Sequence, residues 1–108
     1  MTVEETDVID FISLHPDGSR VVLTISDHLD WEDGEKHAAA LQTKIYRYLD
    51  FVDHGELLER YPKAVDKQVV IEIRGSEPLT AYGERFLEHV RKVAAAEGCL
   101  VEFIYLGA

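Results

Sequence analysis

Long apolar runs are absent from this 108-residue sequence. None approaches the roughly 20 consecutive apolar residues that a membrane-spanning helix requires. The acidic start, from Met1 to Asp7, lacks the basic-then-apolar order of a secretory signal. The one cysteine, Cys99, cannot form a disulfide within the chain, which agrees with a reducing compartment. We therefore expect a cytoplasmic protein that does not associate with membranes.

Basic residues are also few. Eleven lysines and arginines stand against 21 aspartates and glutamates, for a net charge of −10. Nucleic-acid binding requires a clustered basic surface, and no such cluster exists, so a nucleic-acid partner is excluded. The acidic field instead speeds the approach of a basic protein partner. Solubility alone explains the same composition.

Familiar catalytic and cofactor motifs are missing as well. Gly75-Ser76-Glu77-Pro78 has neither the lysine of a phosphate loop nor the glycine spacing of a dinucleotide fingerprint. No Gly-x-Ser-x-Gly nucleophile elbow is present. Cys99 has no base near it in sequence and is interpreted as a buried structural thiol. We predict no catalytic residues, no metal and no cofactor.

What is present indicates one globular domain spanning residues 1–108. Apolar residues make up 46% of the chain and charged residues 30%, as in ordinary folded proteins. Residues 7–14 are rich in β-branched and aromatic side chains, and residues 20–26 alternate apolar with less apolar positions. The Pro16-Asp17-Gly18 turn between them predicts a β-hairpin.

Helical periodicity follows. One stripe predicts a first helix with Asp33 as its cap and Gly55 as its stop, and consists of Ala38, Leu41, Ile45, Tyr48, Leu49 and Val52. A short helical segment over 56–61 ends at Pro62, and a third strand covers 68–74. A second main helix is predicted over about 80–97, with Tyr82, Phe86, Val90 and Val93 buried, before a last strand over 99–106.

The resulting ββαβαβ order predicts an α+β two-layer sandwich. Its four-stranded mixed sheet carries two main helices on one face, because both crossovers should be right-handed. The other face is then wholly or partly open. The first and last strands have apolar residues on both sides, which two layers cannot fully bury. This surplus indicates a partner or self-association surface, unless loops or the N-terminal arm cover it.

The most suggestive cluster of polar residues is the loop from Asp27 to His37. Its candidate binding residues are Asp27, His28, Asp30, Trp31 and Glu32. A metal could use His28, Asp30 and His37, although their spacing matches no defined motif. A solvated acidic loop in which Asp27 or Asp33 caps a turn explains the same residues. Trp31 either folds back over the start of the first helix or faces a partner.

Several segments resemble an uncharacterised family of small acidic bacterial proteins, catalogued as a domain of unknown function. They include 7–11 and 22–31, with Ser26-Asp27-His28-Leu29-Asp30-Trp31 as the most specific part. The resemblance covers most of the chain. It implies a bacterial origin and an autonomous domain, and it brings no activity, ligand or catalytic residue.

Two interpretations of function remain. The first is a non-catalytic protein-interaction or self-associating module, which binds a protein partner or forms a homodimer. The second is a small metal-dependent or acid–base enzyme that uses His28, Asp30, Glu32 and His37 of the Asp27–His37 loop. The enzyme would need these groups to converge around a pocket.

Overall fold

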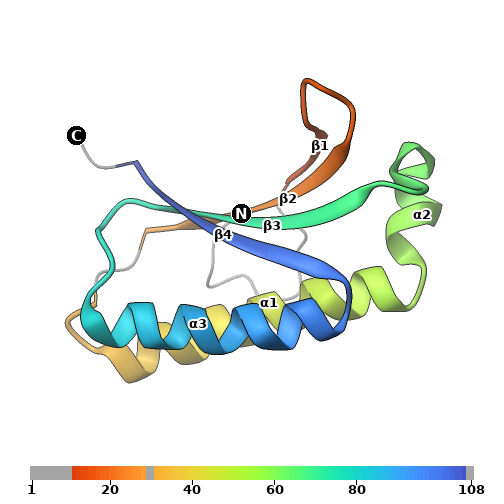
Figure 1. Cartoon of the computed structure of the whole chain (residues 1–108). Helices are drawn as coiled ribbons and strands as arrows, with labels where there is room; N and C mark the ends of the chain where they lie inside the picture. The colour runs from red at the N-terminus through yellow and green to blue at the C-terminus, as the bar shows by residue number, and fades with distance from the viewer. Residues whose placement is uncertain (1–10, 29–30, 107–108) are drawn as a thin grey trace.

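Four strands form one mixed sheet in the order β1-β2-β3-β4 (Figure 1). The computed structural model describes residues 11–28 and 31–106. β1 pairs antiparallel with β2, whereas the β2–β3 and β3–β4 pairs are parallel. The strands are β1 (Phe11–Leu14), β2 (Arg20–Asp27), β3 (Gln68–Gly75) and β4 (Cys99–Tyr105).

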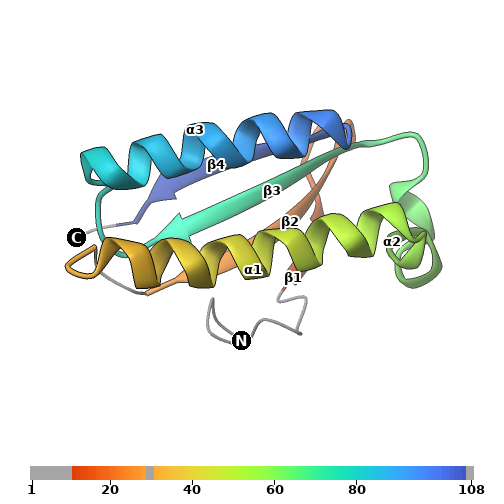
Figure 2. The same ribbon diagram turned by 90° about the horizontal axis from the view of Figure 1, so that it is seen from below.

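Two long helices lie against the same face of this sheet (Figure 2). They are α1 (Gly34–Asp53) and α3 (Ala81–Ala96), while the short α2 (Glu56–Arg60) and the 3-10 turn η1 (Pro62–Ala64) lead from α1 into β3. The predicted α+β fold, its ββαβαβ order and its two helices on one sheet face are therefore confirmed. No helix in the described ranges is long and apolar enough to cross a bilayer.

The predicted turn, helix cap and helix stop lie where the sequence analysis expects them. In the hairpin turn, Gly18 has a φ of 75°, and its amide donates to the carbonyl of His15 at 2.8 Å. At the start of α1, the Asp33 carboxylate accepts a hydrogen bond from the amide of Lys36 at 3.1 Å. Gly55 follows α1 with a φ of 78°, which stops the helix without strain.

The hydrophobic core fills the space between the sheet and the two helices. The helix-facing side of the two central strands contributes Val21, Leu23, Ile25, Val69, Ile71 and Ile73, all buried. The α1 stripe packs on them through Leu41, Ile45, Tyr48 and Leu49. The buried arc of α1 is wider than predicted, because His37, Lys44 and Phe51 are buried too. The Lys44 ammonium lies 5.6 Å from the Tyr48 ring centroid.

The predicted buried face of α3 is confirmed at Val90, only partly at Phe86 and Val93, and is wrong at Tyr82. The residues that face the core are Gly83, Leu87, Val90 and Ala94, while Tyr82 is 40% exposed and Phe86 and Val93 are half-buried. The reason is close approach to Trp31: a Cβ on Gly83 would lie 3.1 Å from the indole ring. Small residues therefore take positions that a hydrophobic stripe would give to large ones.

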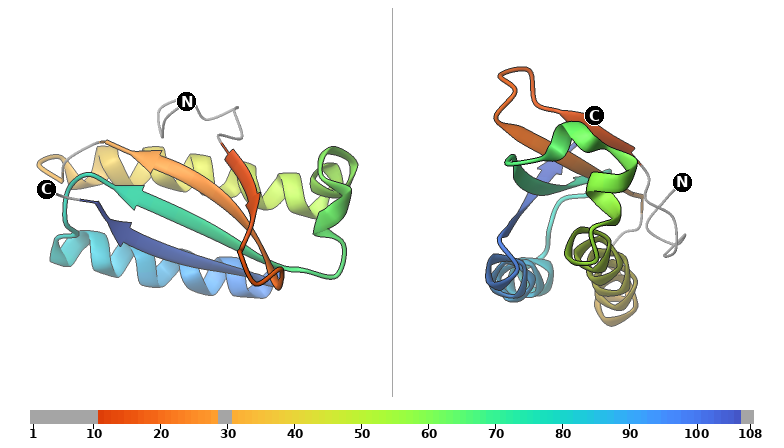
Figure 3. Two further views of the ribbon diagram at one scale, coloured as in Figure 1. Left: turned by 90° about the horizontal axis from the view of Figure 1, so that it is seen from above. Right: turned by 90° about the vertical axis from the view of Figure 1, so that its right-hand side faces the viewer.

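The opposite side of the sheet has no helix over it in the described chain (Figure 3). We call it the open sheet face. By strand alternation and register it consists of Phe11, Ser13, Arg20, Val22, Thr24, Ser26, Gln68, Val70, Glu72, Arg74, Leu100, Glu102, Ile104 and Leu106. Val70 is only 2% exposed, although it lies on the open sheet face and does not belong to the core that fills the space between sheet and helices. The face is therefore partly open, within the predicted range.

Candidate functional site

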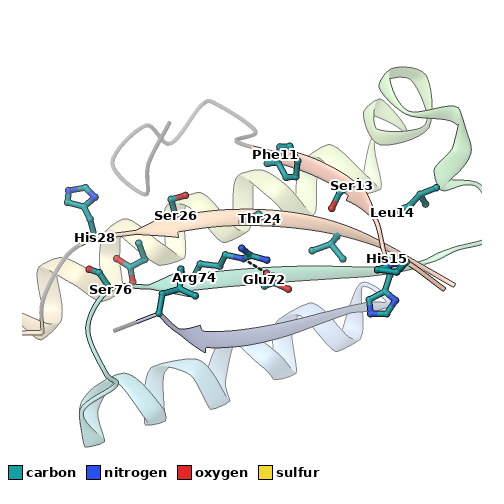
Figure 4. Close-up of a pocket in the computed structure, with 14 residues that line it drawn as sticks. Phe11, Ser13, Leu14, His15, Thr24, Ser26, His28, Glu72, Arg74 and Ser76 are labelled. Carbon is teal, nitrogen blue, oxygen red and sulfur yellow. Dashed lines mark hydrogen bonds and ion pairs between the residues drawn. The ribbon is translucent and has the colours of Figure 1, made fainter. Parts of the chain in front are cut away.

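A hollow of about 600 Å³ lies on the open sheet face (Figure 4). Phe11, Leu14 and His15 border it from β1 and the hairpin turn, and Leu106 borders it beyond β4. Its floor comes from β2 and β3 through Val22, Thr24, Ser26, Glu72 and Arg74. The hairpin rises out of the plane of the central strands (Figure 1), so the sheet itself is curved and makes the hollow.

Large apolar side chains stay exposed on the open sheet face, and two of them, Phe11 and Leu106, line the hollow. The exposed fractions are 60% for Phe11, 44% for Leu100, 37% for Ile104 and 55% for Leu106. The register sets Ser13, Val22, Val70 and Leu100 in one row across all four strands. Apolar surface thus lies along both margins of the face, on β1 and β4. This pattern is typical of a surface that binds another protein.

The charged groups on the open sheet face are paired with one another. The Arg74 Nε donates to Glu72 Oε1 within β3. The Arg20 guanidinium, at the start of β2, lies 3.8 Å from the Glu102 carboxylate on β4. Two arginines therefore balance two glutamates, and the face carries no net charge from these four groups. Exposed ion pairs of this kind contribute little to stability.

The three α-helices carry seven carboxylates and seven lysines or arginines. Exposed carboxylates on the three α-helices are Glu35, Asp50, Asp53, Glu59, Glu84 and Glu88. Just past α3, a hydrogen bond with Asp53 and the charges of Asp53 and Asp50 raise the pKa of the Glu97 carboxyl. The helices therefore carry no net charge, and the acidic surplus of the chain lies outside them.

Below one end of the hollow lies a buried Asp27–His37 pair. His37 Nε2 is 2.8 Å and 2.7 Å from the two carboxylate oxygens of Asp27, and the two side chains are 2% and 1% exposed. Asp27 ends β2, where its carbonyl accepts a hydrogen bond from the amide of Ser76 at 2.9 Å. His37 comes from the first turns of α1. The pair therefore ties the end of the sheet to the start of α1.

Trp31 closes this pair off from solvent. Its ring stacks on the His37 ring with centroids 3.7 Å apart and an angle of 28° between planes. The indole is 9% exposed, and its Nε1 has no hydrogen-bond partner among residues 11–28 and 31–106. Trp31 thus packs over the start of α1, which is the first of the two predicted alternatives. Its role at this point is to cover a buried polar pair.

The structure separates the predicted loop residues. Asp27 and His28 both line the hollow, although only His28 is exposed there (Figure 4). Trp31 is in the core and Glu32 is exposed, while Asp30 lies outside the described residues. The alternative of a solvated acidic loop is therefore wrong for Asp27, which is buried. In residues 11–28 and 31–106, no three His, Cys, Asp or Glu side chains come together that could hold a metal ion.

Sequence reasoning missed two features of this region. It did not pair His37 with Asp27, since it treated both as members of a polar loop. It also did not place Arg20 and Arg74 on the open sheet face. The available signal was the charged pair Glu72 and Arg74 within an otherwise aliphatic strand.

Cys99 is buried at the start of β4, as predicted. Burial, reinforced by the charges of Asp53 and Glu97, raises its pKa to about 11. The unfolded thiol ionises above about pH 8.5, whereas the folded thiol keeps its proton. We expect the free energy of unfolding to fall as the pH rises from about 9 to 11. Urea denaturation across this window measures it, and Cys99→Ala should remove that part of the slope; an unchanged slope would contradict the assignment.

Comparison with known proteins places the chain in one family. It belongs to the family described as a family of unknown function (DUF6572), whose profile matches residues 1–106. No curated protein matches the sequence, and no solved structure matches it.

Proposed function

We propose that this member of the DUF6572 family is a non-catalytic module that binds a protein or associates with itself through its open sheet face. The observation that carries the proposal is the set of exposed apolar side chains on β1 and β4 around a neutral hollow. Exposed apolar side chains gathered on one face often mark binding sites. Because Glu72 and Glu102 are each paired with an arginine, covering the face would not leave these charges buried without a partner.

The proposed binding surface extends to the end of β2. His28 contributes an exposed imidazole at that end of the hollow. The preceding residue, Asp27, is held by its contact with His37. Trp31 and Glu32 remain in the proposal as close neighbours of His28 in the sequence, although neither lines the hollow. A bacterial, cytoplasmic setting completes the proposal, supported by the reduced, buried Cys99.

The enzyme interpretation gains less support from the contacts. His37 is 2% exposed and its Nε2 is engaged by both oxygens of Asp27. A substrate could reach that ring only if Trp31 moved away. The open sheet face requires no such opening, and it is therefore the stronger candidate.

The test is a pair of matched substitutions. Leu100 on the open sheet face is 44% exposed, and Leu58 on α2 is 46% exposed. We expect Leu100→Glu to abolish stoichiometric binding in affinity capture from source cells, because it places an unpaired charge on the apolar surface that the partner would cover. Leu58→Glu should capture the same protein as the wild type. Quantitative mass spectrometry and a second, differently tagged copy of the chain provide the readout.

Two controls complete this test. Both variants should keep the wild-type far-UV circular dichroism spectrum and thermal midpoint, since each changes an exposed side chain. Equal capture by all three proteins, or no stoichiometric capture by the wild type, would reject the open sheet face as the binding surface.

A further inference from the structure

We infer that the hollow on the open sheet face binds a small aromatic carboxylic acid, with Arg74 holding its carboxylate and Phe11 packing on its ring. The ligand is a free small molecule, which goes beyond the protein contact proposed above. Three features of the hollow support this ligand: the hydrogen-bond donors that Arg74 keeps available, the row of the sheet that carries Phe11, and the size and lining of the hollow.

The Arg74 guanidinium is held in place and still has donors to offer. Its Nε donates to Glu72 Oε1, and Figure 4 shows the side chain lying along the floor of the hollow toward Glu72. The Arg74 side chain is 50% exposed, whereas that of Glu72 is 12% exposed. Among residues 11–28 and 31–106, no group bonds to Nη1 or Nη2 of Arg74. The N–H groups of these two nitrogens are therefore available to a ligand.

The chemistry of these donors selects a carboxylate. A guanidinium has no acceptor, so its ligand has to supply acceptors. Nη1 and Nη2 form a planar fork whose two parallel N–H groups match the two oxygens of a carboxylate. The two carboxylates that line the hollow, Glu72 and Asp27, are engaged by Arg74 Nε and by His37, and neither occupies the fork. The charge of Glu72 beside the guanidinium keeps the affinity for a second carboxylate modest.

Phe11 supplies the apolar side of the site. The register pairs Phe11 with Thr24 and Thr24 with Glu72, so Phe11 and Glu72 stand in one row on either side of a short side chain. Neighbouring strands are about 4.8 Å apart, which sets the backbones of Phe11 and Glu72 about 10 Å apart. Phe11 is 60% exposed, and its hairpin rises above the central strands (Figure 1). A flat ring over Thr24 would thus lie between an aromatic side chain and the guanidinium that Glu72 holds.

The size and lining of the hollow are those of a small-molecule site. Its volume of about 600 Å³ lies within the range of roughly 300–1,000 Å³ that ligand pockets span. Leu14 and Val22 extend the apolar lining beyond Phe11. Ser26, which the register pairs with Arg74, adds a hydroxyl on the polar side. Apolar walls with a few polar groups in fixed positions are the usual composition of such pockets.

Titration of the purified, isotope-labelled chain with benzoate, followed by NMR, tests the inference. The Arg74 Nε–Hε resonance and the backbone amide of Thr24 report on the site. We expect both to shift in a saturable way, with a dissociation constant of about 5 mM or lower. Benzamide has the same ring without the charge, and acetate has the charge without the ring. Each should bind at least about tenfold more weakly than benzoate.

Matched variants locate the site. Arg74→Gln should raise the dissociation constant of benzoate at least about tenfold, and Arg74→Lys, which keeps the charge and lacks the fork, at least about threefold. Arg85→Gln makes the same charge change at an exposed position of α3 and should leave it within about twofold. Phe11→Ala should weaken binding at least about threefold. Val65→Ala, at a 55% exposed residue that does not line the hollow, should not.

Three results would overturn the inference: shifts that do not saturate by about 50 mM benzoate, equal binding of benzamide and benzoate, or wild-type affinity in Arg74→Gln. None of them bears on the proposed protein contact, which is tested by capture from cells with Leu100→Glu, at a residue that does not line the hollow. Loss of that capture with benzoate binding intact would reject the protein contact and leave the small-molecule site standing.

Discussion

Replacing His37 with alanine should lower the free energy of unfolding by about 3 kcal/mol or more. The change removes the donor that lies 2.7 Å and 2.8 Å from the oxygens of Asp27, and it leaves that carboxylate buried. Burying a carboxylate with fewer hydrogen bonds is costly, because water no longer reaches it. Urea denaturation followed by far-UV circular dichroism measures the loss.

Two further experiments distinguish loss of the Asp27–His37 contact from the general effect of removing a histidine on the free energy of unfolding. His89 is exposed on α3, and His89→Ala should change the free energy of unfolding by less than about 0.5 kcal/mol. In a double-mutant cycle, Asp27→Ala combined with His37→Ala should cost clearly less than the sum of the single changes. Additive losses would show that the two side chains do not stabilise each other.

Replacing Trp31 with alanine should cost about 3–5 kcal/mol of unfolding free energy. The indole is 9% exposed, stacks on His37 and contacts the helix at Gly83. Its removal leaves a cavity and admits water to the Asp27–His37 pair. Circular dichroism is the suitable probe, because Trp31 is the only tryptophan and its fluorescence disappears with it.

Trp31→Phe provides the matched control. Phenylalanine keeps an aromatic ring over His37 and removes the indole Nε1 donor, which has no hydrogen-bond partner in the part of the chain that the structure describes. We expect it to recover at least half of the stability lost in Trp31→Ala. If both variants unfolded at the same urea concentration, stacking on His37 would not explain the role of Trp31.

The sequence by itself determined the features that depend on neighbours along the chain. Alternation along β2 and β3 identified the helix-facing side of the sheet, and the Asp33 cap and Gly55 stop bounded α1. These predictions succeed because backbone preference and side-chain period act within a few residues. The order of strands and helices then left one sheet face without a helical layer.

Only the tertiary structure decided which polar residues meet. Asp27 and His37 are brought together because the end of β2 and the start of α1 pack under Trp31. The same packing sets Gly83 rather than Tyr82 against the indole, where an added Cβ would lie only 3.1 Å from the ring. The Arg20–Glu102 ion pair likewise required β2 and β4 to lie on either side of β3. Contacts between distant segments depend on how whole surfaces fit, and local sequence patterns carry little information about that fit.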